Sequence, residues 1–358
     1  MRMRPGGPRA ALALAGALAG LAAAAPGASA AGTTLTLSGW YPRAMAFSGD
    51  RLVWAEAGTA RIDPRRFAGA PADAAPFEYY RVEVSRVRLS RDSRRFAGAP
   101  ETPVAVRTSI GAMAPGILQP TGDGGFVTVP GVTRFAPPVV RCCDADGLET
   151  VIESDGRPDA PVTLAAVPSG ARVSYVQATP EGRQLLRGPD PAAAPVATAL
   201  PAAPGLVAIG GGRRAWVDPA SPAALVLQPE ADPAAPAVTL PLPGPALRVW
   251  SSGPLAVVAA RAGARVTLLR VGLAAARPRA VRVWTGRALP RAVAVGGGSV
   301  AVSEGRRVRA SRSGALRPVF SGRRVIDAVA VDGRRLAFVQ RATRKGARIG
   351  VVGLGRVR

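Results

Sequence analysis

The chain carries few of the side chains that perform chemistry in enzymes. None of its 358 residues is a histidine, which excludes His-based catalytic triads and His-ligated metal sites. Its two cysteines, Cys142 and Cys143, are adjacent, and neighbouring Cα atoms lie about 3.8 Å apart, closer than the roughly 4.4–6.8 Å of ordinary disulfides. We therefore expect two thiols or a strained vicinal disulfide without a role. The alternative is a stiff patch on a binding loop.

Carboxylates are the remaining candidates for a metal or catalytic site. Asp144 and Asp146 follow the cysteines in the stretch DADGLE. This stretch lacks the further acidic positions and the terminal Glu that an EF-hand loop requires, and it is typical of an Asp-rich β-turn. We expect no metal ion and no cofactor.

The charge of the chain is strongly positive, and nearly all of it comes from arginine. Lysine and arginine together number 47 against 23 acidic residues, which gives a net charge of +24, and Lys345 is the single lysine. A balance this basic can indicate an anionic partner. The arginines are scattered over turns rather than clustered in the sequence, so we do not expect nucleic acid as that partner.

The first thirty residues have the order of a secretory signal peptide. Arginines at positions 2, 4 and 9 precede an Ala/Leu/Gly run over residues 10–25, and residues 28–30 form a small-residue cleavage site. The run is weaker than the roughly 20 strongly apolar residues of a membrane span, and no later segment is long and apolar enough to be one. We expect residues 1–30 to be removed and residues 31–358 to be secreted as one domain. The alternative is an uncleaved N-terminal anchor.

An internal repeat organises the rest of the chain. Its centre is an apolar strand, a glycine turn and a second apolar strand, as in AMAFSGDRLVW, AVAVGGGSVAV and AVAVDGRRLAF. The intervals between the turn glycines are 75, 46, 42, 41, 44 and 36 residues, so all but the first are close to 42. The turn glycines are Gly49, Gly124, Gly170, Gly212, Gly253, Gly297 and Gly333.

Each repeat fits four short antiparallel strands. The clearest copy reads ALRVWS, LAVVAA, RVTLLRVG and AVRVWTG, within residues 246–286. Glycine supplies the positive φ of tight hairpin turns, and alternating apolar residues let both faces of a sheet pack on neighbouring sheets. Seven such units predict an all-β fold, and specifically a seven-bladed β-propeller.

The two ends of the predicted repeat complete each other. The last unit has three strands, whereas TTLTLSG at 33–39 matches the endings of fourth strands and has no unit of its own. We expect this N-terminal strand to pair with RIGVVGL at 348–354, to complete the last blade and to close the ring. The alternative is that residues 33–39 form a frayed linker.

The long first interval contains an insertion at about 58–100. The sequence RRFAGAP occurs twice in it, at 65–71 and 94–100, and FEYYRVEVSRVRL between the copies alternates like a strand. We interpret the insertion as an extended hairpin or long loop and as the best candidate contact surface. The alternative is a solvated loop made by local duplication. The candidate contact residues are Arg65, Arg66, Phe67, Phe77, Tyr79, Tyr80, Arg94, Arg95 and Phe96.

The first strands of the units would surround a central channel, where some propeller enzymes place catalytic carboxylates. Here those strands read AMAF, LAAV, LVAI, LRVW and AVAV, with Ala and Val in place of Asp or Glu. Asp327 lies beside one such strand, and Asp50 and Asp332 fall in turns. We interpret all three as turn or capping residues.

The last unit, VDGRRLAFVQRATRKGARIGVV, combines a DG turn, a Leu-Ala-Phe strand, a polar turn with Arg and Gly, and an Ile-x-Val strand. This combination resembles the repeat of TolB-type propellers. The resemblance implies a propeller of six or seven blades that serves as a protein-interaction platform in the bacterial envelope, and it identifies no partner-binding residue. The residues that fit are Asp332, Gly333, Leu336, Ala337, Phe338, Arg341, Gly346, Ile349 and Val351.

These observations lead to one expected function and two alternatives. We expect a secreted, non-catalytic and monomeric β-propeller that binds a protein or an envelope polymer at the bacterial cell surface. The first alternative is a carbohydrate-active hydrolase or lyase that uses carboxylates alone, which three or more acids at the channel mouth would favour. The second is a basic adhesin for anionic envelope polymers, which arginines clustered on one face would favour.

Overall fold

The computed structural model describes fifteen stretches of the chain, and these contain 27 strands and no helix. Within them, therefore, no helix is long and apolar enough to cross a membrane. The predicted signal peptide lies outside the described residues. The described residues are 35–38, 41–49, 51–62, 80–90, 115–120, 126–130, 139–144, 147–152, 162–169, 172–178, 184–187, 196–198, 206–232, 234–344 and 347–357.

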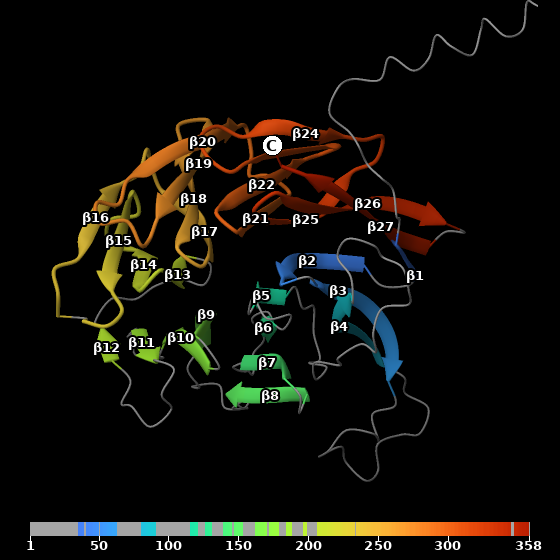
Figure 1. Ribbon diagram of the computed structural model, residues 1–358, viewed down its shortest axis with the longest axis horizontal. Coiled ribbons are helices and arrows are strands. Elements are labelled where there is room, and N and C mark those ends of the chain that lie inside the picture. The colour runs from blue at the N-terminus through green and yellow to red at the C-terminus, as the bar shows by residue number, and fades with distance from the viewer. Residues whose placement is uncertain are drawn as a thin grey trace, which may run out of the picture.

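The strands form seven antiparallel sheets, which we number 1 to 7 in chain order. Sheet 1 has three described strands, and each of the others has four (Figure 1). Sheet 1 contains β2 (Tyr41–Ser48), β3 (Arg51–Ile62) and β4 (Tyr80–Ser90). Sheet 2 contains β5 (Pro115–Pro120), β6 (Phe126–Pro130), β7 (Val139–Asp144) and β8 (Gly147–Ile152). Sheet 3 contains β9 (Val162–Ser169), β10 (Arg172–Ala178), β11 (Gln184–Arg187) and β12 (Val196–Thr198).

The remaining four sheets are built the same way. Sheet 4 contains β13 (Val207–Gly210), β14 (Arg213–Val217), β15 (Ala224–Pro229) and β16 (Val238–Pro241). Sheet 5 contains β17 (Ala246–Ser252), β18 (Leu255–Ala262), β19 (Arg265–Gly272) and β20 (Ala280–Gly286). Sheet 6 contains β21 (Ala292–Gly296), β22 (Ser299–Glu304), β23 (Arg307–Ser311) and β24 (Arg317–Ser321). Sheet 7 contains β25 (Ile326–Asp332), β26 (Arg335–Arg344), β27 (Ala347–Arg356) and β1 (Leu35–Ser38).

The repeat predicted from the sequence coincides with these sheets. All seven predicted turn glycines fall between the first and second strands of a sheet. Four of them, Gly49, Gly253, Gly297 and Gly333, have φ between 51° and 55°, a left-handed conformation that glycine adopts without steric cost. The all-β class and the four-stranded antiparallel units are confirmed, whereas the closed seven-bladed ring stays a prediction.

The sheets pack face to face, and each described core lies between two neighbours. In β18, Ala256 and Val258 belong to the cluster shared with sheet 4, whereas Val257 and Ala259 belong to the cluster shared with sheet 6. Two further clusters lie between sheets 6 and 7 and between sheets 7 and 1. Successive side chains of a strand point to opposite faces, so one strand contributes to two cores. Each fully buried Val or Leu contributes about 1.5–3 kcal/mol.

The N-terminal strand completes the last sheet. β1 pairs antiparallel with β27, from Leu35 opposite Val352 to Ser38 opposite Ile349. The pairing of residues 33–39 with the end of the chain is therefore confirmed over the described residues, and the frayed-linker alternative is wrong there. Sheet 7 consequently joins segments from the two ends of the sequence.

The first strands of consecutive sheets lie against one another. β5 contacts β2 and β9, β13 contacts β9 and β17, and β21 contacts β17 and β25. β25 in turn contacts β2, the first strand of sheet 1. In Figure 1 each of these seven strands is the member of its own sheet that lies nearest the middle of the molecule.

Glycine permits close contact between neighbouring sheets where the first strand ends. A Cβ atom on Gly296 of sheet 6 would lie 2.1 Å from the carbonyl oxygen of Val331 in sheet 7, and one on Gly210 of sheet 4 would lie 2.0 Å from the carbonyl oxygen of Gly253 in sheet 5. Real Cβ atoms do not approach a backbone oxygen this closely. These positions therefore need glycine for space.

Replacing Gly296 by alanine should force sheets 6 and 7 apart. We expect Gly296→Ala to lower the free energy of unfolding by about 1–3 kcal/mol, the usual cost of overpacking, as measured by urea denaturation. The matched control is Gly272→Ala, because a Cβ there would meet only the Ala275 side chain, at 3.5 Å. Equal stability of the two variants would contradict the close-approach argument.

Removing β1 should expose β27 as an edge strand. We compare a chain that starts at Thr34 with one that starts at Tyr41. Loss of the four residue pairs between β1 and β27 should lower the free energy of unfolding by about 2–4 kcal/mol, since each hydrogen bond contributes roughly 0.5–1.5 kcal/mol. Hydrogen exchange should accelerate in β27 first. Unchanged exchange in β27 would show that β1 does not stabilise sheet 7.

Candidate functional site

The residues singled out from the sequence fall largely outside the described part of the chain. Tyr80 is the first residue of β4, and Ile62 of β3 is its register partner. Cys142 and Cys143 are consecutive residues of β7, and the register of β7 with β8 shifts between Cys142 and Asp144. Arg65, Arg66, Phe67, Phe77, Tyr79, Arg94, Arg95 and Phe96 lie outside the described residues.

Asp327 stands out among the described residues because it occupies a β-bulge. It lies within β25, not beside the strand as we had expected, and the register of β25 with β26 shifts between Ile326 and Ala328. β2 has the same irregularity between Pro42 and Ala44, at Arg43. Bulges redirect a side chain out of the regular alternation and are common next to functional sites.

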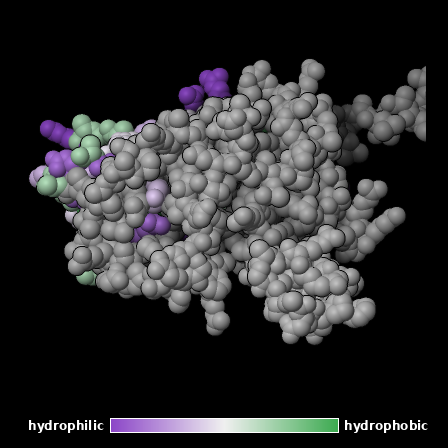
Figure 2. Space-filling model, turned by 90° about the horizontal axis from the view of Figure 1, so that it is seen from below, coloured by the Kyte–Doolittle hydropathy of each residue, from purple (hydrophilic) through white to green (hydrophobic). Residues whose placement is uncertain are grey.

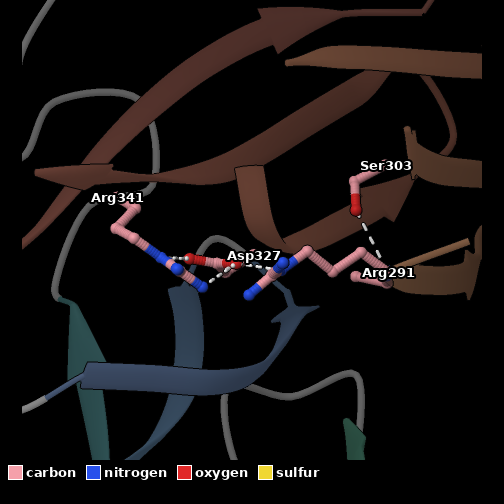
Figure 3. A network of polar contacts seen from close by, with 5 residues as sticks. Arg291, Ser303, Asp327 and Arg341 are labelled. Atoms are coloured by element: carbon pink, nitrogen blue, oxygen red, sulfur yellow. Dashed lines mark hydrogen bonds and ion pairs between the residues drawn. The ribbon is translucent and has the colours of Figure 1, made fainter. Parts of the chain in front are cut away.

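Two arginines bind the Asp327 carboxylate (Figure 3). Arg341 donates two hydrogen bonds, from Nε to Oδ2 and from Nη2 to Oδ1, both at 2.9 Å. Arg291 forms an ion pair with Oδ1 through its Nε. The three residues come from two sheets, because Asp327 and Arg341 belong to sheet 7 and Arg291 immediately precedes β21 of sheet 6. The cluster therefore links these two sheets.

Backbone contacts fix the positions of both arginines. The Arg291 amide donates to the carbonyl oxygen of Ser303 at 3.1 Å, and the next amide, that of Ala292, donates to the Ser303 hydroxyl at 3.0 Å. The Arg341 amide donates to the carbonyl oxygen of Val325 at 2.7 Å. The guanidinium groups thus extend from anchored main chain toward a common carboxylate.

The two arginines of the cluster reach the surface, whereas its carboxylate is buried. The Asp327 side chain is 6% exposed, whereas the side chains of Arg341 and Arg291 are 33% and 47% exposed. The hydrogen bonds to Asp327 raise the pKa of Arg341 above its usual value.

Further exposed arginines lie at the same end as this cluster, where the first strands of sheets 5, 6 and 7 begin. The turns between second and third strands and the loops between sheets meet at this end, which we call the arginine rim. The carboxylates in these connections are Glu304, which bonds to Arg309 and Trp284, and Asp327. The rim arginines are Arg261, Arg265, Arg287, Arg291, Arg306, Arg307, Arg323 and Arg324.

The opposite end of the same sheets is also basic. Its connections carry Arg277, Arg279, Arg312 and Arg334, all exposed. Positive charge alone therefore does not distinguish the two ends. The cluster around Asp327 does, because it occurs at the rim.

Exposed apolar surface is sparse among the described residues. Val238, Val281 and Leu289 are the exposed large hydrophobic residues there, and they belong to three different segments. On the coloured surface in Figure 2, hydrophilic and hydrophobic residues are interspersed at the end that holds β15 and β16. A polar partner fits such a surface better than an apolar one.

A second arginine network lies in sheet 4, and its guanidinium group is fully buried, so it cannot reach a ligand. Arg214 is 1% exposed, its Nη2 donates to Gln228 Oε1 at 2.5 Å, and its Cζ lies 4.7 Å from the centroid of the Trp216 ring. Burial lowers the pKa of Arg214, an effect that Glu230 partly opposes. We assign this arginine a structural role.

The described residues contain no group of three or more His, Cys, Asp or Glu side chains that could hold a metal ion. Among the described inner strands, β25 holds two carboxylates in polar contacts, Asp327 and Asp332. Nitrogen atoms of arginine occupy both oxygens of Asp327, and Arg335 binds Asp332. The arrangement can fix guanidinium groups in space. It does not present a pair of carboxylates to a substrate.

Comparison with known proteins bears on the fold alone. No family model matches the chain, and no curated protein matches it. Among solved structures, the chain is similar to the crystal structure of the computationally designed Ika8 protein, with a TM-score of 0.51 and 10% sequence identity, over 89% of this chain and 97% of that chain.

Removing the Asp327 carboxylate should destabilise the contact between sheets 6 and 7. We expect Asp327→Ala to lower the free energy of unfolding by about 2–4 kcal/mol, because two charge-assisted hydrogen bonds from Arg341 and the ion pair with Arg291 are lost. Asp232→Ala is the control, since the Asp232 carboxylate accepts a hydrogen bond from the Ala234 amide in an exposed loop. Denaturant titration of both variants measures the difference. A similar small loss in both would show that the cluster contributes little to stability.

Proposed function

We propose that the chain is a seven-bladed β-propeller that acts as a secreted, non-catalytic binding scaffold at the bacterial cell envelope. Each sheet corresponds to one blade, and β1 completes the seventh blade. The succession of contacts between first strands, which includes the contact of β25 with β2, supports the circular arrangement. The four cores between neighbouring sheets support it as well, since propeller blades bury their faces against each other.

The partner binds at the arginine rim. The observation that carries this assignment is the Arg291–Asp327–Arg341 cluster, in which anchored guanidinium groups from two sheets meet at the rim. Sites built on rigid elements with locked side chains are suited to recognition. The sparse exposed apolar surface agrees with a polar or charged partner.

A specific observation also favours the second candidate, an adhesin for anionic envelope polymers. The rim carries eight exposed arginines and two carboxylates, each of which is bonded to arginine. Such a surface attracts polyanions, and the attraction weakens as salt screens it over roughly 8–10 Å at physiological ionic strength. A scaffold and an adhesin share this surface and differ in the identity of the partner.

Binding to envelope material tests the proposal. The chain covering residues 31–358 is incubated with washed bacterial envelopes, and the sedimented fraction is measured at rising salt. We expect saturable binding. The double variant with Arg323→Glu and Arg324→Glu should lower the affinity about tenfold or more, because the two changes reverse charge at the rim. Arg277→Glu with Arg279→Glu is the matched control, since both residues lie at the opposite end, and it should weaken binding much less.

Two outcomes would contradict the proposed function. Release of soluble saccharides from the envelopes would indicate the carbohydrate-active enzyme instead. Equal loss of binding in both double variants would show that net charge, and not the rim, determines association.

Amino-terminal sequencing of the secreted protein should begin at Ala31 if residues 1–30 are a signal peptide.

A further inference from the structure

We propose that Arg270 anchors a binding site for one phosphate group, at the end of the sheets opposite the arginine rim. This site goes beyond the proposed function and does not depend on it. Arg270 lies in β19 of sheet 5, two residues before that strand ends, and its guanidinium group reaches sheet 6. The charged group is therefore held at the junction of two sheets.

Two backbone carbonyl groups of sheet 6 fix the Arg270 guanidinium in place. Nη1 donates to the carbonyl oxygen of Arg312 at 2.5 Å, and Nη2 donates to that of Gly298 at 2.9 Å. Arg312 directly follows β23, and Gly298 belongs to the glycine turn between β21 and β22. A guanidinium group has five N–H donors, and these bonds use two of them. The side chain is thus ordered before any ligand arrives, which reduces the conformational entropy lost on binding.

The charge of Arg270 is not balanced by a carboxylate of the described residues. Its partners are the two neutral carbonyl groups, and the residue is half-buried. Burial lowers the pKa of Arg270, whereas for Arg214 the charge of Glu230 partly opposes the same effect. A partly buried charge without a counter-ion carries a desolvation cost. A bound anion would offset that cost, and the planar guanidinium matches the spacing of two oxygens of one phosphate group.

The surroundings of Arg270 suit an anion with more than one negative charge. Arg312 is exposed, as are Arg277 and Arg279 in the connection after β19. A Cβ atom on Gly298 would meet no atom within 4 Å, so space is open beside one of the two anchoring turns. Because a phosphate group carries about −1.5 to −2 charges at pH 7, this site favours it over a singly charged carboxylate. The connections of sheets 5 and 6 at this end contain no acidic residue, and they cover residues 253–254, 273–279, 297–298 and 312–316.

Arg213 offers a matched comparison at the same end. It is the first residue of β14, and its Nη1 donates to the carbonyl oxygen of Ala275, in the connection after β19, at 2.9 Å. Sheet 4 carries Glu230 and Asp232 in the connection after β15, also at this end. Both arginines thus link neighbouring sheets, but Arg270 is held at two points and lies among turns without acidic residues. A linking role alone explains Arg213, and we expect phosphate to prefer Arg270.

Arginine side-chain NMR tests the site directly. The Nε–Hε resonances of the protein are followed at constant ionic strength during separate titrations with inorganic phosphate, glycerol phosphate and sodium acetate. The Arg270 resonance should shift saturably with phosphate and at a lower concentration than with acetate, whereas the Arg213 resonance should not saturate. Tighter binding of glycerol phosphate than of inorganic phosphate would identify a phosphate ester, and the reverse order free phosphate, as the ligand. Arg270→Lys and Arg213→Lys assign the two resonances.

Variants with unchanged net charge separate a site from general attraction. Arg270→Lys keeps the charge but loses the planar group, and it should raise the dissociation constant for phosphate about tenfold or more, the typical effect of losing a charge-assisted hydrogen bond. Arg213→Lys makes the same change at the matched position and should alter the constant by less than about threefold. Arg312→Ala removes an exposed charge and should raise the constant about two- to fivefold, which keeps the test valid if Arg270→Lys does not fold.

Parallel, non-saturating shifts of the Arg270 and Arg213 resonances would overturn the inference, as would equal phosphate affinity of Arg270→Lys and the unaltered chain. The rim variant with Arg323→Glu and Arg324→Glu should keep its phosphate affinity within about twofold, because its changes lie at the other end of the sheets and salt screens them. A large loss of phosphate affinity in that variant would place the bound anion at the rim and would equally overturn the inference.

Discussion

Each sheet has two apolar faces, and this constraint determines how the chain assembles. In β18 six consecutive residues, from Leu255 to Ala260, are buried, although only alternate side chains share a face. A lone sheet could bury one set and would leave the other in water. Both sets are buried because sheet 5 lies between sheets 4 and 6. Stability is therefore a property of neighbouring pairs of sheets, and no sheet is stable by itself.

The same constraint explains the composition of the first strands. These strands approach one another most closely, so they carry alanine and valine, as in Ala328 and Ala330 of β25. Polar groups at the turns that follow the first strands are bonded across sheets. The Ser299 hydroxyl donates to the carbonyl oxygen of Gly333, and Arg335 Nη1 donates to that of Gly49, both at 2.6 Å. The second bond joins residues 286 positions apart in sequence, so it connects the end of the chain to its beginning.

Much of the fold was predictable from the sequence because its signals are local. A glycine turn between two apolar runs needs only a few residues to be recognised, and the pairing of β1 with β27 followed from a missing strand in the last unit. The cluster at Asp327 was missed because its contacts join residues 14 and 36 positions away, Arg341 and Arg291. A local interpretation therefore made Asp327 a turn residue, and its network with two arginines corrects that interpretation.

One sequence signal could have identified the cluster. Arg43, Arg291 and Asp327 each lie six residues before a turn glycine, namely Gly49, Gly297 and Gly333. Charged residues at the same repeat position of consecutive units should meet where the first strands begin. Two other sheets have leucine at this position, six residues before the turn glycine. It is Leu164 in sheet 3 and Leu247 in sheet 5, and in both sheets the strand register shifts there.

The repeated bulge therefore provides one backbone geometry on which different side chains are placed. Function depends on those side chains rather than on the fold. In the proposed recognition, the exposed rim arginines attract an anion over distances that salt limits to roughly 8–10 Å. That attraction depends on the charge and its distance and not on the shape of the group that carries it. Lysine could therefore replace arginine at the exposed rim positions and still attract a polyanion.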